Sequence, residues 1–290
     1  MLRHAVLLFA LAGCVLGAKL PLRRVVPTGP ARSLSGAAGR IYGGQDAYSG
    51  QFPYQVSLQL SLLIIRAHNC GGTIVSESTV VTAGHCVMGL GTYYAVAGEL
   101  NLKKDEGTEQ ESKVSEQIAH PDYPGGLTVS ANDIAVFKLS TPFTLGTYVK
   151  AIPLAAAGSL PTAGTSAIAS GWGSTPTATT PDILQWLDAT IIDWESCRDL
   201  LDEAGIEDNP VVESMICTGP VTGGISLCSG DSGGPLVQNG ELIGVTSWAI
   251  TPCGSVGSPS GFTPGLRLQR LRRTVHLTAL CQRSNKRMTI

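Results

Sequence analysis

Polar and apolar residues begin to alternate with a period of two after residue 50, and this pattern indicates β-strands. The segment Tyr54–Leu60 alternates in this way, and short apolar runs follow at residues 71–75, 80–82, 134–139 and 184–192. Many short strands with turns every 8 to 12 residues or so are typical of β-barrels and β-sandwiches. The pattern therefore predicts an all-β fold.

Three segments between these runs are candidates for loops or linkers. The apolar run Leu62–Ile65 is either the end of a strand or an exposed loop. The segment Lys103–Glu116 is predicted to be an exposed loop because it is charged. Residues 151–164, rich in Ala, Gly and Pro, are predicted to be a linker between two sets of strands.

The N-terminal residues have the pattern of an export signal. Ala5–Leu16 is an apolar run of 12 residues, too short to span a bilayer comfortably, and small or modest residues precede a cleavage point after Gly17. We therefore expect residues 1–17 to be a signal peptide and the protein to be secreted; the alternative is a buried N-terminal helix. No later stretch is long and apolar enough for a transmembrane helix, so no membrane partner is expected.

Charge is distributed unevenly along the 290 residues. The formal net charge is −2, but residues 41–261 hold 22 acidic side chains and 7 Lys or Arg, a balance of −15, and residues 262–290 hold 7 Lys or Arg and no acid. An acidic body of this kind repels phosphates, which argues against nucleic acid as a partner.

Three motifs point to nucleophilic catalysis. Ser232 lies in the glycine-rich run Gly230–Pro235, where the backbone can turn sharply, but serine needs a base to become a strong nucleophile. His85 ends the apolar run 81–86, and Asp133 begins another apolar run. The chain order is His, Asp, Ser, the order of chymotrypsin-type proteases. The G-x-S-x-G elbow of lipases also fits around Ser232, but Pro235 and a strand follow where that fold needs a helix.

These motifs resemble those of the chymotrypsin/trypsin family of secreted serine proteases, over residues 41 to about 263. The resemblance implies two antiparallel six-stranded β-barrels, about 41–150 and 151–263, with the active site in the cleft between them. It points to a chymotrypsin-like to elastase-like member, similar to arthropod digestive proteases.

The resemblance also implies roles for the motif residues. Ser232 would attack the peptide carbonyl, His85 would carry the proton, and Asp133 would hold the imidazole in the correct tautomer. The backbone N–H groups of Gly230 and Ser232 would form the oxyanion hole. Ser247, next to Trp248, matches a residue that supports the aspartate.

Residues 18–40 are expected to be an activation propeptide. They hold three prolines, four arginines, one lysine and no acid, a composition that cannot form a core. By resemblance, cleavage after Arg40 frees an ammonium on Ile41, which pairs with Asp231 and fixes the backbone around Ser232. An activating trypsin-like protease is therefore an expected partner.

By resemblance, the floor of the pocket that sets substrate preference is the residue six positions before Ser232. Trypsin-like enzymes carry an aspartate there, whereas this chain carries Ser226. Ala249 and Ser260 would form the walls of the pocket, beside Trp248. A neutral pocket cannot pair with Lys or Arg, so cleavage after apolar residues such as Phe, Leu or Tyr, or smaller ones, is expected.

The chain has eight cysteines, of which Cys14 lies in the signal and Cys281 in the C-terminal tail. Six remain, and disulfides are the default in an exported chain, but six cysteines allow 15 pairings that sequence alone leaves open. The resemblance implies the pairs Cys70–Cys86, Cys197–Cys217 and Cys228–Cys253. Neither C-x-x-C nor H-E-x-x-H is present, so we expect no zinc site, no other metal and no cofactor; a calcium loop between Glu99 and Glu109 has nothing further in its favour.

The resemblance ends near Thr263. Pro264 interrupts the expected last strand, and residues 264–290 form an atypical basic tail in place of the usual C-terminal helix. A substitute helix, a disordered tail and an altered reading frame or splice product stay open, and the last is favoured.

Three functions compete. The preferred one is a secreted, zymogen-activated serine endopeptidase that is monomeric, acts on polypeptides and is bound by protein protease inhibitors, with the gut lumen as one candidate location. The second is an impaired protease homologue that acts by binding, because of the aberrant C-terminus. The third takes the basic tail as an anchor to heparin or a membrane surface, which the acidic body opposes.

Overall fold

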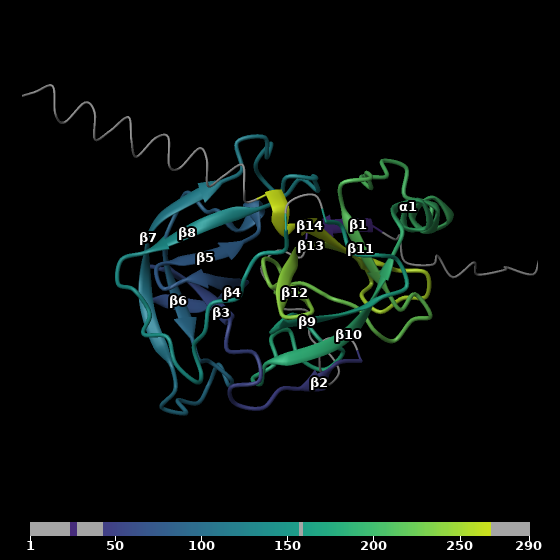
Figure 1. The fold of residues 1–290 in the computed structure, drawn as a ribbon. Helices are drawn as coiled ribbons and strands as arrows, with labels where there is room; N and C mark the ends of the chain where they lie inside the picture. Colours follow the sequence, from purple (N-terminus) through teal and green to yellow (C-terminus); the bar gives the residue numbers. More distant parts are fainter. Residues whose placement is uncertain (1–23, 28–42, 157–158, 268–290) are drawn as a thin grey trace, which may run out of the picture.

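The structure is a computed structural model that describes residues 24–27, 43–156 and 159–267 (Figure 1). Its first half is a closed antiparallel barrel with the strand order β3-β4-β5-β8-β7-β6. These strands are β3 (Gln55–Leu62), β4 (Ile65–Ser76), β5 (Thr79–Thr82), β6 (Thr92–Ala97), β7 (Gln110–Ala119) and β8 (Ala135–Leu139).

The second half is a barrel with the strand order β13-β12-β9-β10-β11-β14, closed by pairing between β13 and β14. These strands are β9 (Ser166–Gly171), β10 (Gln185–Ile192), β11 (Ile216–Gly219), β12 (Pro235–Gln238), β13 (Glu241–Thr251) and β14 (Ser260–Pro264). Two short strands join it from outside: β1 (Arg24–Pro27) pairs with β13, and β2 (Gln45–Asp46) pairs with β10. The predicted fold of two six-stranded antiparallel barrels is confirmed.

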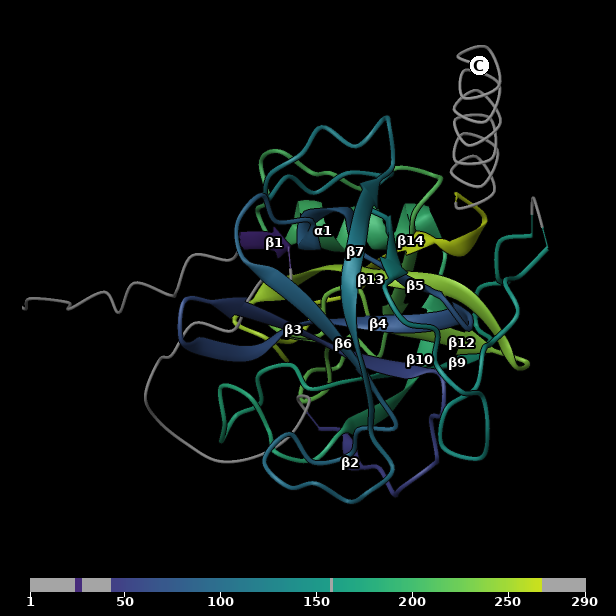
Figure 2. The same cartoon turned by 90° about the vertical axis from the view of Figure 1, so that its left-hand side faces the viewer.

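The barrels lie side by side (Figure 1), and the view turned by 90° shows the first barrel in front of the second (Figure 2). Alternate side chains of each strand point inward, so Val56 and Leu58 of β3 are fully buried. Leu242 and Val245 of the second barrel belong to the same apolar cluster as these first-barrel residues. The relative position of the barrels is therefore fixed by a shared core.

One sequence prediction is wrong. The charged segment Lys103–Glu116 is a loop only as far as Glu109, because β7 begins at Gln110. Ser112 and Val114 of this strand are buried, while Glu111, Lys113 and Ser115 between them are exposed. The charges mark the solvent face of a barrel strand.

The other uncertain segments resolve as follows. Leu62 ends β3, Ile65 begins β4, and the turn between them exposes Leu63 and Ile64 almost completely, so the run contains a strand end and a tight exposed turn. A helix that the sequence pattern did not predict, α1 (Trp194–Glu203), follows β10, and Asp193 caps it by accepting a hydrogen bond from the Ser196 N–H.

The C-terminal strand β14 ends at Pro264, where the sequence predicted an interruption, and the short 3-10 helix η2 (Gly265–Arg267) follows. The signal peptide, the bond between Arg40 and Ile41, and residues 268–290 lie outside the described residues, so the segment boundaries proposed there stay predictions. Across the described ranges, no helix has the length and apolar character needed to cross a membrane.

Candidate functional site

His85 and Asp133 are joined by two hydrogen bonds within the first barrel. His85 lies in the short 3-10 helix η1 (Gly84–Cys86) that follows β5, and Asp133 lies just before β8, which pairs with β5. The His85 N–H donates to Asp133 Oδ1 at 2.8 Å, and the ring Nδ1 donates to Oδ2 at 2.7 Å. Both side chains are buried, so this pair fixes the imidazole in one orientation and makes Nδ1 the protonated nitrogen.

Ser232 comes from the second barrel and completes a hydrogen-bonded row of three side chains, Asp133, His85 and Ser232, which we call the catalytic row. Its Oγ lies 2.7 Å from His85 Nε2, which is free to accept the hydroxyl proton once Nδ1 is the donor. Ser247 of β13 donates from its Oγ to Asp133 Oδ2 at 2.6 Å. The structure thus brings together four predicted residues in a continuous hydrogen-bonded chain, Ser247–Asp133–His85–Ser232.

The turn that carries Ser232 is held from both sides. Gly230 has a φ of 100° and Gly233 a φ of 75°, the left-handed region where glycine is favoured. The Gly71 N–H of the first barrel donates to the Ser232 carbonyl at 2.7 Å, and the Gly233 N–H donates to the Thr246 carbonyl at 2.8 Å. The two N–H groups predicted to hold an oxyanion, those of Gly230 and Ser232, therefore sit on an anchored backbone.

His68 is a site residue that the sequence reasoning missed. Its Nε2 donates to the Gly230 carbonyl at 3.0 Å, and its Nδ1 accepts from the Ser57 hydroxyl at 2.9 Å. Burial lowers the pKa of His68 to about 4, although its bond to Gly230 acts in the opposite direction. His68 is therefore a neutral donor that ties β4 of the first barrel to the Ser232 turn.

Asp231 points away from Ser232, into the second barrel. Its side chain is completely buried, with Oδ1 accepting from the Gly173 N–H at 2.8 Å and Oδ2 from the Cys228 N–H at 2.9 Å. Burial raises its pKa to about 7, against the effect of these two hydrogen bonds. A cation close to this carboxylate would stabilise its charged form, as the predicted pairing with the Ile41 ammonium requires. Ile41 lies outside the described residues.

The predicted pocket residues lie together. Ser226 and Ser260 are buried; Ser226 Oγ accepts from the Gly254 N–H at 2.7 Å, and Ser260 Oγ accepts from the Leu227 N–H at 3.2 Å. Ala249 is paired with Ser260 between β13 and β14. Trp248 is fully buried and packs against Gly261, where any Cβ would collide with the indole. The groups that meet around Ser226 are hydroxyls and backbone amides.

Three disulfides brace these loops, and they join the pairs that the resemblance implied. Cys70–Cys86 holds the turn that carries His85, and Cys228–Cys253 links the segments on either side of the Ser226 pocket. Cys197–Cys217 ties α1 to β11.

A separate group of acids lies in the loop before β7. Glu99, Glu106 and Glu109 each place one carboxylate oxygen within 4.8 Å of the others, a set of oxygens of the kind that Ca²⁺ prefers. Burial raises the pKa of Glu99 to about 7, and the negative charges of Glu109 and Glu106 add to the effect. The expectation that no metal binds stays a prediction.

Known proteins resemble most of this chain. A family model described as Trypsin matches residues 41–270. Trypsin-1 of Astacus astacus is 39% identical over 233 residues, which cover 77% of this chain and 94% of that protein. Trypsin I-P1 of Gallus gallus is 37% identical over 226 residues, covering 77% of this chain and 84% of its own length. Lectizyme of Glossina austeni is 36% identical over 238 residues, covering 78% and 82%.

Proposed function

The chain belongs to the trypsin family and is a serine endopeptidase, and from this premise we propose that it is secreted as a zymogen and cleaves after apolar residues with Ser232, His85 and Asp133. The observation that carries the proposal is the buried hydrogen-bonded row from Asp133 through His85 to Ser232.

Each residue of this row has a defined task. Ser232 Oγ attacks the substrate carbonyl while His85 Nε2 takes its proton, and the resulting imidazolium is stabilised by Asp133. The same proton then passes to the leaving amine, which leaves an acyl group on Ser232 for water to remove. The N–H groups of Gly230 and Ser232 stabilise the oxyanion, and one such donor is typically worth about 3–4 kcal/mol of barrier.

The preference for apolar residues rests on the chemistry around Ser226. Among the described residues at this pocket, Ser226, Ser260 and Ala249 supply no carboxylate, so a Lys or Arg side chain would lose water without gaining an ionic partner. Several relatives are named trypsins, but this chain has Ser226 where trypsin-like enzymes carry an aspartate.

Zymogen activation rests on Asp231. Burial disfavours the charged form of this carboxylate, which lies next to Ser232, and a nearby cation would stabilise it. Cleavage after Arg40 supplies such a cation, the Ile41 ammonium. The three disulfides fit an oxidising, extracellular setting. The partners are polypeptide substrates, an activating trypsin-like protease and protein protease inhibitors, and the enzyme acts as a monomer.

The test uses the full chain treated with trace trypsin, and Ser232→Ala as the control. Peptide substrates ending in Phe, Leu, Ala or Arg are compared after the added trypsin is removed. Activity on Phe or Leu that requires cleavage at Arg40 and is absent from the control supports the proposal. Activity mainly on Arg would contradict the pocket assignment, and a soluble, correctly cleaved but inactive protein would contradict the catalytic one.

A further inference from the structure

The strand β1 comes from the segment before Arg40, yet it lies on the second barrel close to the catalytic row. Arg24 is paired with Thr251, Val25 with Ile250, Val26 with Ala249 and Pro27 with Trp248, in antiparallel register. Ser247, which donates to Asp133, directly precedes this stretch of β13. A piece of the propeptide thus occupies the strand edge next to the catalytic residues.

The edge that β1 occupies is the one that continues from the Ser232 turn. At Trp248 and Ala249, β13 pairs with both β14 and β1, so β14 and β1 lie on opposite edges of β13. At Val245, β13 pairs with β14 and with β12, so β12 also lies opposite β14. β1 therefore extends the edge on which β12 and the preceding Ser232 turn lie.

The direction of β1 leads the chain toward the catalytic residues. Because β1 is antiparallel to β13, its chain runs from Thr251 toward Trp248, and so toward Ser247 and Ser232. A peptide that adds to a free strand edge is held by main-chain hydrogen bonds, whatever its sequence. A polypeptide whose scissile bond reaches Ser232 from this edge would need the same backbone positions.

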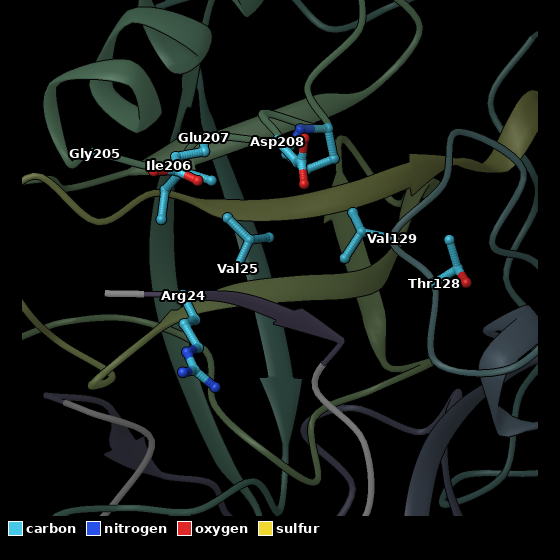
Figure 3. A pocket seen from close by; sticks show the side chains of 9 residues that line it. Arg24, Val25, Thr128, Val129, Gly205, Ile206, Glu207 and Asp208 are labelled. Carbon is cyan, nitrogen blue, oxygen red and sulfur yellow. The ribbon is translucent and has the colours of Figure 1, made fainter. Parts of the chain in front are cut away.

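Val25 supplies the side-chain anchor. It packs against the apolar cluster that contains Trp248 and Ile250, together with Val129 and Ile206. Figure 3 shows Val25 between Ile206 and Val129 above the β13 ribbon, while the Arg24 side chain points the other way, away from Asp208. These residues line a cavity of about 700 Å³, so an apolar side chain at position 25 has room to be accommodated.

We propose that residues 24–27 are a substrate-like inhibitory strand: they fill the peptide-binding edge of β13 in the uncleaved chain, and the released leader competes with substrate for it. This inference rests on the proposed function, because the edge matters only if Ser232 cleaves peptides. It adds a second control over activity to the pairing of Ile41 with Asp231.

The first experiment measures inhibition in trans. The full chain is cleaved at Arg40, freed of its leader and assayed with a synthetic peptide of residues 18–40. We expect competitive inhibition, retained by Val25→Leu and Arg24→Gln peptides and weakened about tenfold or more by Val25→Asp, since a carboxylate is costly to bury. An active enzyme that the peptide does not inhibit, or inhibits equally with Val25→Asp, would overturn the inference.

The second experiment does not depend on activity, so it separates failure of this inference from failure of the proposed function. Hydrogen exchange is measured in the uncleaved full chain carrying Ser232→Ala, over the peptide that contains residues 248–251. Val25→Asp is expected to speed exchange there, whereas Arg24→Gln leaves it unchanged. Equal exchange in all three chains would refute the strand pairing, even if the enzyme proves inactive.

Discussion

His68 donates a hydrogen bond to the carbonyl oxygen of Gly230, a residue 162 positions later in the chain and in the other barrel. The bond joins β4 directly to the turn whose N–H groups are proposed to bind the oxyanion. The neutral imidazole is suited to this task because it also accepts from Ser57, which fixes its tautomer.

We predict that His68→Ala lowers kcat about tenfold and changes KM less than about twofold, because the oxyanion donors lose alignment while the pocket is untouched. Steady-state kinetics on an apolar peptide substrate test this. His68→Gln, which keeps a donor, should recover part of the loss. Since the pKa of His68 is about 4, the ratio of variant to parent kcat should stay constant from about pH 5 to 8. A variant that changes only KM would contradict the positioning role.

Because Asp231 is buried, we predict that the uncleaved chain becomes less stable as pH rises from about 4 to about 7. Its folded pKa of about 7 is above the ordinary 3.8, so the folded state holds a proton that the unfolded state releases. The contribution is fully present below about pH 4 and is lost as pH rises to about 7. Urea unfolding across this range should show it, and Asp231→Asn should remove the slope. An unchanged slope in Asp231→Asn would mean that other groups are responsible.

Ser226→Asp should convert the preference of the enzyme. The new carboxylate would lie among the Ser260 hydroxyl and backbone amides and would pair with an incoming guanidinium. We expect kcat/KM for Arg substrates to rise about 100-fold and that for Phe substrates to fall. Ser255→Asp, at a half-buried neighbouring position whose hydroxyl donates to the Pro252 carbonyl, is the matched control and should change neither value. A rise with both variants would indicate general attraction of cations.

Gly233→Ala should destabilise the enzyme more than backbone strain alone explains. Its φ is 75°, and an added Cβ would lie 2.6 Å from the Gly71 carbonyl oxygen and still closer to the Thr82 hydroxyl. Gly107→Ala is the matched control, because its φ is 80° and nothing lies within 4 Å. We expect a loss of about 1 kcal/mol for Gly107→Ala and at least about 2 kcal/mol more for Gly233→Ala. Chemical denaturation gives both values, and equal losses would rule out the steric contact.

The sequence pattern predicted short strands and the catalytic motifs because both have strong local signals, whereas the arrangement as two barrels was implied by the family resemblance. Period-two alternation in Tyr54–Leu60 indicates a half-buried strand directly. Ser232 lies between glycines that allow a sharp backbone turn, and this is also visible in the local sequence. Strand β7 was missed because its exposed residues carry charges that obscure the buried Ser112 and Val114.

Helix α1 and His68 were missed for other physical reasons. Helix α1 buries only Cys197 and Leu201, one turn apart, which is too narrow a stripe to stand out in a sequence. His68 has no local motif, because its role depends on a carbonyl oxygen in the other barrel. Contacts of this kind are set by how the barrels pack, and no single stretch of sequence encodes them.

The position of β1 has a consequence for how activation depends on dilution. Residues 18–40 contain no cysteine, so no disulfide ties the leader to the enzyme once the Arg40–Ile41 bond is cut. Before cleavage the tether gives β1 an effective concentration of the order of millimolar at its edge on β13; afterwards only the bulk concentration counts. Enzyme stored at high concentration would keep part of its own leader bound, and mixing into a larger volume would complete the release. Cleavage would start activation, and dilution would finish it.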